Sequence, residues 1–316
     1  MSSTRPHSDV PASSPTLPEH PPLRPLRDRG RVRAALIANL VCQIGIIMTG
    51  GLVRLTGSGL GCPTWPQCTP GSFVPTAQQE QGYHKLIEFG NRTITFVLIA
   101  VAVWLIVEVL RHCKDRPGLV KASFVPLIGV LAQGIVGGII VLTHLDPRTV
   151  SPHFLLSILL VAYSTWLLVR FDEGDGPVQA TVPAGVRVLA KITAVVGAVV
   201  IVLGTAVTGS GPHSGDSAAD VRFGFDPRTT SWLHADSVML FVGLVLGLWA
   251  IAKIVPVPMS YAKGWTWVLV LCVVQGLVGY TQYFLALPIA LVTVHLLLAA
   301  VLTAALTYAV LATRRR

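Results

Sequence analysis

The stretch GLVRLTGSGLGCPTWPQCTPGSFVP, residues 51–75, follows a long apolar run and places two cysteines in a loop rich in glycine and proline. The apolar run, residues 33–54, is long enough to cross a lipid bilayer, which takes about 20 residues of helix. The loop therefore marks a point where the chain leaves a membrane. The chemistry open to Cys62 and Cys68 depends on which side of the membrane that is.

The composition indicates a membrane protein along most of the chain. Of the 316 residues 52% are hydrophobic and 12% are charged, and this charged fraction is about half that of a soluble domain. The net charge of +9 is explained by basic connections between spans and requires no nucleic acid as a partner. The apolar runs predict an all-α membrane protein with eight transmembrane helices, at residues 33–54, 85–110, 121–143, 151–171, 185–209, 231–253, 263–284 and 287–312.

Basic residues predict the orientation of these spans. They precede the first span and flank alternate connections, as Arg33, Arg111, Arg170 and Lys253 illustrate. Because short cytoplasmic segments carry an excess of Lys and Arg, both termini are predicted to be cytoplasmic. The loop of residues 55–84 then lies on the extracytoplasmic side, where thiols can oxidise.

Short motifs recur in the same order along the two halves of the chain. Because each half has an even number of spans, the repeat is parallel, with an axis along the membrane normal. The matching pairs are QGIVGG at 133–138 with QGLVGY at 275–280, HFLLS at 153–157 with HLLLA at 295–299, TGSG at 56–59 with TGSG at 208–211, and Asn91 with His234. The repeat predicts two pseudo-symmetric four-helix bundles.

This repeat also predicts the domain organisation. Residues 33–171 form the N-terminal half and residues 185–312 the C-terminal half. A cytoplasmic linker at 172–184 joins them. Residues 1–32, rich in Pro, Ser and Arg, are predicted to be a disordered cytoplasmic arm, and residues 313–316 a basic tail.

Three histidines lie at similar depth, each in the first third of an even-numbered span: His153, His234 and His295. Two imidazoles that face each other across a four-helix unit suit axial ligation of a haem. The C-terminal half offers His234 and His295, whereas the N-terminal half offers His153 and, at the position equivalent to His234, Asn91. Asparagine is a poor iron ligand, so we expect a tightly held haem in the second half and an exchangeable one in the first. The alternative is that these histidines form hydrogen bonds that stabilise helix contacts.

The second span begins with YHKLIEFGNR, which places His84, Glu88 and Asn91 on one helix face. A carboxylate within a span is costly and is usually paired or functional. Glu88 is therefore either the partner of Arg92 or Lys85, or a group that handles protons.

Taken together, RLTGSGLGC with CPTWPQC, the IEFGNR segment and the three histidines in an eight-span duplicated bundle resemble haem A synthase. The resemblance covers about residues 33–310. It implies an oxidoreductase of the bacterial plasma membrane that oxidises a methyl group of haem O to a formyl group. The product, haem A, would serve terminal oxidases.

The resemblance also implies roles for individual residues. His234 and His295 match the axial ligands of a haem B cofactor, His153 matches the ligand of the substrate haem, and Glu88 matches a catalytic glutamate. Family members carry a histidine three residues after that glutamate, where this chain has Asn91. We therefore expect Asn91 in the substrate haem site and an open iron position beside it.

The extracytoplasmic cysteine pair of the family matches Cys62 and Cys68, which implies a disulfide. Pro63, Trp65 and Pro66 stiffen the loop that it closes. Two functions are open for the disulfide: a staple for a lid over the first-half site, or a redox pair that exchanges with a thiol protein.

Besides haem O and the lipid bilayer, the expected partners are haem O synthase and a thiol–disulfide or electron-donor protein. Three other classes of protein are compatible with some of these features. They are a two-haem membrane cytochrome for quinol-linked electron transfer, a non-catalytic haem carrier or assembly factor, and a transporter.

Overall fold

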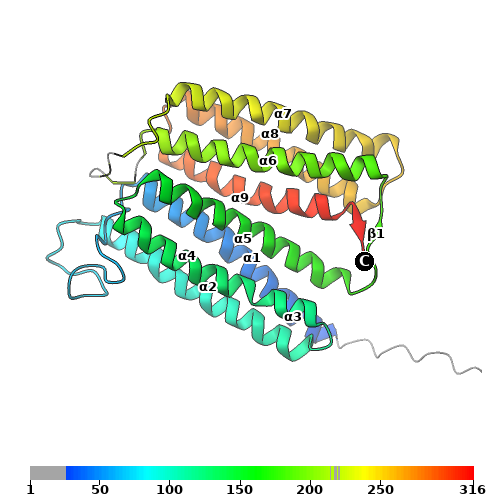
Figure 1. Ribbon diagram of the computed structural model, residues 1–316, viewed down its shortest axis with the longest axis horizontal. Coiled ribbons are helices and arrows are strands. Elements are labelled where there is room, and N and C mark those ends of the chain that lie inside the picture. Colours follow the sequence, from blue (N-terminus) through cyan, green and yellow to red (C-terminus); the bar gives the residue numbers. More distant parts are fainter. Residues whose placement is uncertain (1–25, 214, 217–218, 220) are drawn as a thin grey trace, which may run out of the picture.

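The computed structural model describes residues 26–213, 215–216, 219 and 221–316. Its long helices run side by side along one direction (Figure 1). In this described part, eight spans are long and apolar enough to cross a membrane, with α3 and α4 together forming the third, which confirms the predicted all-α, eight-span class. The helices are α1 (Leu26–Leu55), α2 (His84–His112), α3 (Pro117–Ser123), α4 (Val125–Leu142), α5 (Pro147–Glu173), α6 (Ala184–Ser210), α7 (Pro227–Ile254), α8 (Met259–Phe284) and α9 (Ile289–Leu311).

The third span is interrupted at Phe124, where the sequence predicts one continuous helix. The short helix α3 ends at Ser123 and α4 starts at Val125, with Pro126 in its first turn. Proline has no N–H to donate, and its ring clashes with the carbonyl four residues earlier. A new helix therefore starts at Val125, which places Pro126 in a first turn, where no N–H is needed.

Helices α5 and α7 both begin at an Asp-Pro-Arg-Thr sequence, four residues before the predicted starts. Asp146 accepts a hydrogen bond from the backbone N–H of Arg148 at 2.8 Å. Asp226 accepts one from the backbone N–H of Thr229 at 2.7 Å. Hydrogen bonds from the side chain and backbone of Arg148 hold the pKa of Asp146 below its ordinary value, and those of Thr229 do the same for the pKa of Asp226. These are N-caps that stabilise the first helical turn.

The helices of each half close into a ring. In the N-terminal half α1 contacts α2, α2 contacts α4, α4 contacts α5 and α5 returns to α1. In the C-terminal half α6, α7, α8 and α9 have the same order of neighbours. Helices α2 and α5 are therefore opposite each other in one ring, and α7 and α9 in the other. The parallel repeat that relates the two halves is still a prediction, and so are the residues at which each half begins and ends.

The two rings meet along α1 and α5 on one side and α6 and α9 on the other. A buried apolar cluster at this seam includes Ile47 of α1, Ile158 and Val161 of α5, and Ala300 of α9. Each ring also has its own apolar core, around Leu105 and Leu167 in the N-terminal half and around Val245, Trp265 and Val268 in the C-terminal half.

The predicted linker and tail are joined by a short strand pair. Strand β1 (Gln179–Ala180) pairs antiparallel with β2 (Arg314–Arg315), so the chain end is fastened to the connection between the halves. Helix α1 starts at Leu26, so residues 26–32 of the predicted disordered arm are helical. Residues 1–25 of that arm lie outside the described residues.

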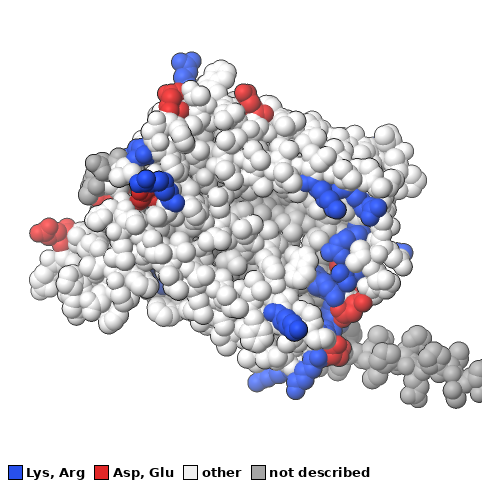
Figure 2. All heavy atoms as spheres, viewed as in Figure 1, with Lys and Arg blue, Asp and Glu red and all other residues white. Residues whose placement is uncertain are grey.

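Charged side chains gather at the two ends of the bundle, with an uncharged band between them (Figure 2). Lys and Arg dominate the end that carries the C-terminus. This distribution is the one expected of helices whose middle lies in hydrocarbon.

Candidate functional site

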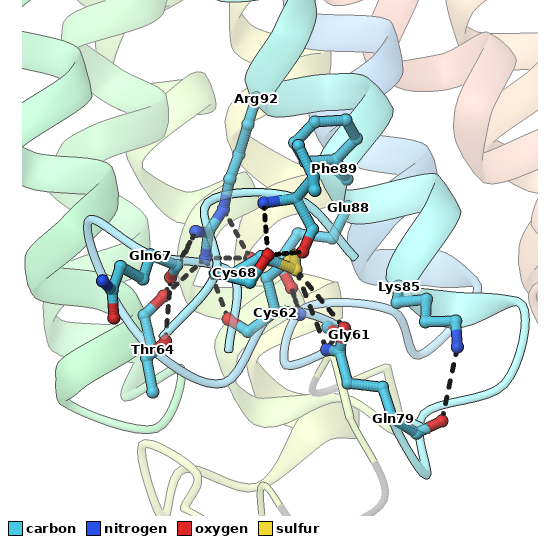
Figure 3. Close-up of a disulfide and its surroundings, with 12 residues drawn as sticks. Gly61, Cys62, Thr64, Gln67, Cys68, Gln79, Lys85, Glu88, Phe89 and Arg92 are labelled. Carbon is cyan, nitrogen blue, oxygen red and sulfur yellow. Dashed lines mark hydrogen bonds and ion pairs between the residues drawn. A yellow bond between two sulfur atoms is a disulfide. The ribbon is translucent and has the colours of Figure 1, made fainter. Parts of the chain in front are cut away.

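Glu88 forms an ion pair in the first turns of α2 and is 5% exposed. Its Oε1 accepts hydrogen bonds from Nη2 of Arg92 at 2.7 Å and from Nε at 3.1 Å (Figure 3). Its Oε2 accepts one from the backbone N–H of Cys62 at 2.7 Å. The helical spacing of four residues brings the two charges onto one face. Of the two partners that the sequence left open, Arg92 holds the carboxylate, whereas Nζ of Lys85 donates to the Thr76 carbonyl at 2.6 Å.

Arg92 fastens the cysteine loop to α2. Its Nη2 donates to the carbonyls of Cys62 at 2.8 Å and Thr64 at 3.1 Å, and its Nη1 donates to Thr64 at 3.1 Å and Gln67 at 3.2 Å. The guanidinium offers five N–H donors in a rigid plane and so can hold several carbonyls and a carboxylate at once. The Glu88–Arg92 pair therefore fixes the position of the loop.

The predicted disulfide between Cys62 and Cys68 is present, with an S–S distance of 2.04 Å. Both cysteines have an exposed fraction of 0%. Gln79 supports the loop from the other side, donating from Nε2 to the Gly61 carbonyl at 3.1 Å (Figure 3). Because thiol–disulfide exchange requires attack on an accessible sulfur, this burial favours the staple over the redox pair.

Trp65 extends the loop from α2 to α4. Its indole ring lies on Gly138 of α4, where a β-carbon would come within 2.4 Å of the ring. Only glycine leaves this space, so Gly138 permits the close approach. The loop thus reaches across two helices at one end of the N-terminal ring.

Each of the three histidines packs against a glycine on a neighbouring helix. A glycine at these positions leaves room for an imidazole in a helix interface that is otherwise closely packed. Measured from the place of an added β-carbon, Cε1 of His153 is 3.8 Å from Gly137, Cε1 of His234 is 3.4 Å from Gly204, and Cε1 of His295 is 3.2 Å from Gly279.

His153 and His295 have matching surroundings in the two halves. Gln133 donates from Nε2 to the His153 carbonyl at 2.9 Å, and Gln275 donates to the His295 carbonyl at 3.1 Å. Nδ1 of each imidazole is buried and has no hydrogen-bond partner among the described residues. Nδ1 of His153 and Nδ1 of His295 therefore do not form hydrogen bonds between helices, which is the alternative function that the sequence left open for these histidines.

His234 and Asn91 occupy the helices opposite those two histidines. Nδ1 of His234 lies 3.0 Å from the carbonyl of Val200. Since a carbonyl only accepts, Nδ1 carries the proton and Nε2 keeps its lone pair, as in many metal-ligating histidines. In the N-terminal half, Oδ1 of Asn91 accepts a hydrogen bond from Thr49 at 2.8 Å.

These surroundings fit a haem in each ring, with different numbers of ligands. Iron binds an imidazole through a nitrogen lone pair, which His234 presents at Nε2. In the C-terminal half His234 and His295 come from opposite helices of the ring. In the N-terminal half the helix opposite His153 carries Asn91, which has no imidazole and whose Oδ1 accepts a hydrogen bond from Thr49.

His84 shares a helix face with Glu88 but is bound to the loop. Its Nδ1 lies 2.9 Å from Oγ of Ser58, which in turn lies 2.8 Å from Oγ1 of Thr56. The imidazole of His84 is therefore part of the loop support. It does not take the place that a second iron ligand would need near Asn91.

A contact between the halves was missed in the sequence. Arg54 donates from Nε to the His213 carbonyl at 2.8 Å and from Nη2 to the Thr208 carbonyl at 3.1 Å. The backbone N–H of Gly59 donates to the Gly215 carbonyl at 2.8 Å. The two TGSG motifs are the signal that could have indicated it, because each lies at the end of the helix that reaches this contact.

The fold and the site define a multi-span helical membrane protein with imidazoles suited to haem and a loop-capped carboxylate. The model of the COX15-CtaA family, described as cytochrome oxidase assembly protein, matches residues 33–213. Since this is more than half of the chain, the chain belongs to that family. The resemblance found in the sequence is thereby confirmed at the level of the family.

Curated relatives agree with this assignment. A protein named Heme A synthase from Geobacillus kaustophilus is 28% identical over 152 residues, 48% of this chain and 46% of that protein. One from Exiguobacterium sibiricum is 31% identical over 150 residues, 46% of this chain and 48% of that protein. One from Symbiobacterium thermophilum is 26% identical over 260 residues, 77% of this chain and 83% of that protein. The chain thus spans about half the length of the Geobacillus relative.

Proposed function

We propose that this chain is a haem A synthase, an oxidoreductase that converts a methyl group of haem O to the formyl group of haem A for terminal oxidases. One observation carries the proposal: the two rings differ in their polar groups. In the C-terminal ring His234 and His295 lie on opposite helices, whereas in the N-terminal ring Asn91 stands opposite His153 and the buried Glu88–Arg92 pair is added. The relatives named Heme A synthase support the same activity.

In this proposal the two rings divide the work. His234 and His295 hold haem B, and a bound haem B supplies electron transfer to or from the substrate site. His153 binds the iron of the substrate haem O and so places its macrocycle within the N-terminal ring. Asn91, held by Thr49, leaves the opposite side of that haem without a protein ligand.

Glu88 is the proposed catalytic residue. Conversion of a methyl group to a formyl group breaks C–H bonds and forms a C=O bond, and a positioned carboxylate can take part in the proton transfers that accompany these changes. The guanidinium of Arg92 and the N–H of Cys62 hold both of its oxygens in fixed directions. The disulfide-closed loop covers this end of the ring and restricts the entry of water, which strengthens electrostatic interactions at the carboxylate.

The proposed location is the bacterial plasma membrane, with both termini cytoplasmic. The predominance of Lys and Arg at the end that carries the C-terminus supports this orientation. The cysteine loop then faces the extracytoplasmic side. The proposed partners are the enzyme that supplies haem O and an electron-donor or thiol–disulfide protein.

The test is the haem content of the purified protein, produced in a host that supplies haem O. Haems are extracted, separated by chromatography and identified by mass spectrometry for the wild type, Glu88→Gln and Glu108→Gln. Glu108 is the matched control, because it is a second buried carboxylate on α2, bonded to Trp104 at 3.3 Å and far along the helix.

We expect haem A or its hydroxylated intermediate in the wild type and in Glu108→Gln. In Glu88→Gln the oxidised haems should fall at least about a hundredfold, the usual contribution of a general base, while haem B is kept. Haem B alone in the wild type, with haem O left unchanged, would contradict the synthase and favour an electron-transfer protein or a haem carrier.

A further inference from the structure

Helices α4 and α5 leave an apolar groove of about 460 Å³ on the outside of the N-terminal ring. Its walls include Val125, Gly129 and Ala132 of α4 and Leu156, Leu159 and Trp166 of α5. Leu156 is 41% exposed and Leu159 62% exposed, so the groove opens toward the lipid.

The groove begins beside the proposed iron ligand. Gln133 is part of its lining, and Nε2 of Gln133 donates to the carbonyl of His153 at 2.9 Å. From Leu156 the groove follows α5 to Trp166, ten residues or roughly 15 Å along the helix axis. It thus runs from the level of His153 into the depth of the membrane.

The internal repeat shows why the groove lies in this half. Adding the repeat offset places Leu271 at the position of Gly129 and Val274 at the position of Ala132, whereas Gln133 and Gln275 are identical. Leu160 of α5 lies in the space that a side chain at Gly129 would occupy, 2.4 Å from an added β-carbon. Gly129 therefore lets Leu160 pack closely against α4 at the groove, and Ala132 keeps the groove wall low, whereas the C-terminal half has larger residues at both repeat-related positions.

We propose that this groove binds the farnesyl tail of haem O; the inference rests on the proposed function. Haem O and haem B share their iron, macrocycle and propionates, and haem O alone carries a hydroxyethylfarnesyl tail. A site that separates them must therefore recognise the tail. The half assigned to haem O has a groove next to His153. The half assigned to haem B has Leu271 and Val274 at the positions that correspond to Gly129 and Ala132.

The physical basis of this recognition is shape. Lipid chains are as apolar as the groove, so the hydrophobic effect gives little preference for the tail over a lipid chain. Contacts along a fitted groove are individually weak but numerous, and they are lost when a wall residue protrudes. A tail covalently attached to a macrocycle already bound at His153 also has a high effective concentration at the groove.

The first test fills the groove and measures which haems remain bound. Ala132→Leu places a larger side chain in the groove, and Val274→Leu is the control at the repeat-related position. We expect Ala132→Leu to lower the tailed haems, haem O and haem A together, by about tenfold per polypeptide, with haem B unchanged. Val274→Leu should leave both haems at the wild-type level. Tailed haem at the wild-type level in Ala132→Leu would overturn the inference.

The second test identifies by crosslinking what occupies the groove. A photoreactive benzoylphenylalanine replaces Leu159 in the groove or Phe96, which is 71% exposed on α2 and outside the groove. Irradiation should give an adduct with the mass of haem O or haem A at 159 and lipid adducts at 96. Lipid adducts alone at 159, in protein that carries tailed haem, would overturn the tail site. A wild type without any tailed haem would instead refute the proposed function, and the tail site with it.

Discussion

The two halves of the molecule share the order of their helices and several helix contacts, and they differ at the end that carries the cysteine loop. In both, a glutamine donates to the backbone of a histidine one helix away, and that histidine packs against a glycine. In both, an arginine gathers loop carbonyls: Arg92 holds the cysteine loop, and Arg222 donates to Gly211 at 3.0 Å and to Ala219 at 2.8 Å. Only the N-terminal half adds a buried carboxylate and a disulfide to this arrangement among the described residues.

The difference shows how a duplicated frame can take two functions. The contacts that position an imidazole are kept in both copies, since they depend on helix packing. The groups that suit a reaction, Glu88 and its loop, lie in the half where Asn91 takes the position of His234. The C-terminal copy keeps two imidazoles and is suited to hold a haem permanently.

Loss of a single histidine should separate the two halves most strongly. His295→Ala removes one of the two proposed ligands of haem B, and His153→Ala removes the proposed ligand of the substrate haem. Because loss of a supporting residue alone typically costs 10–100-fold in metal affinity, we expect loss of a direct ligand to cost at least about a hundredfold. Extracted haem per polypeptide should show haem B lost in His295→Ala and tailed haem lost in His153→Ala.

Loss of haem B with retention of the tailed haem in His153→Ala would contradict the assignment of the two haems to the two halves. Gln133→Ala is a useful control, because it removes the hydrogen bond to the His153 backbone and leaves the imidazole in place. Its effect on tailed haem should be smaller than that of His153→Ala.

The sequence predicts those features that depend on local spacing. The eight spans follow from the lengths of the apolar runs, and the Glu88–Arg92 pair follows from helical spacing. The start of α5 at Pro147 was missed because Asp146 and its proline precede the apolar run. The break at Phe124 was missed because the apolar run continues across Pro126.

Features that depend on contacts between distant segments were not predictable in this way. The carbonyls held by Arg54 lie more than 150 residues away, in the last turn of α6 and in the loop that follows it. The hydrogen bond from Cys62 to Glu88 requires the loop to fold back onto α2. Nothing in the spacing of the cysteines fixes that path, because the loop backbone takes its shape from Arg92, Gln79 and Gly138 together.

The residue opposite His153 offers a sharper test of the difference between the rings. Asn91→His restores in the N-terminal half the imidazole that His234 provides in the other. We expect the substrate haem to change from one to two protein ligands and its ferric iron from high spin to low spin, measured by electron paramagnetic resonance. The freed Thr49 hydroxyl can accept from the new imidazole, as the Val200 carbonyl accepts from His234.

His234→Asn is the reciprocal variant and should shift the haem B signal from low spin toward high spin. His234→Asn and His295→Ala each leave one proposed histidine ligand, so the spin state is measured on the haem B that stays bound, whereas Asn91→His should keep the tailed haem at the wild-type level. A low-spin signal from the substrate haem in the wild type would contradict the one-ligand site. It would mean that another residue of the N-terminal ring completes the coordination.

The smallest effect is expected from the disulfide, and its test separates the staple from the redox pair. Replacing both Cys62 and Cys68 by serine should destabilise the loop by about 2 kcal/mol in the chain-entropy picture for so short a ring. Amide hydrogen exchange at Cys62, whose N–H is bonded to Glu88, should then be about thirtyfold faster, whereas the loop of residues 211–213 in the other half should exchange as before.

Haem A production should fall less than tenfold, because Arg92 still holds the loop carbonyls. Complete loss of haem A with unchanged hydrogen exchange would instead show that the buried disulfide opens during turnover and exchanges with a thiol partner.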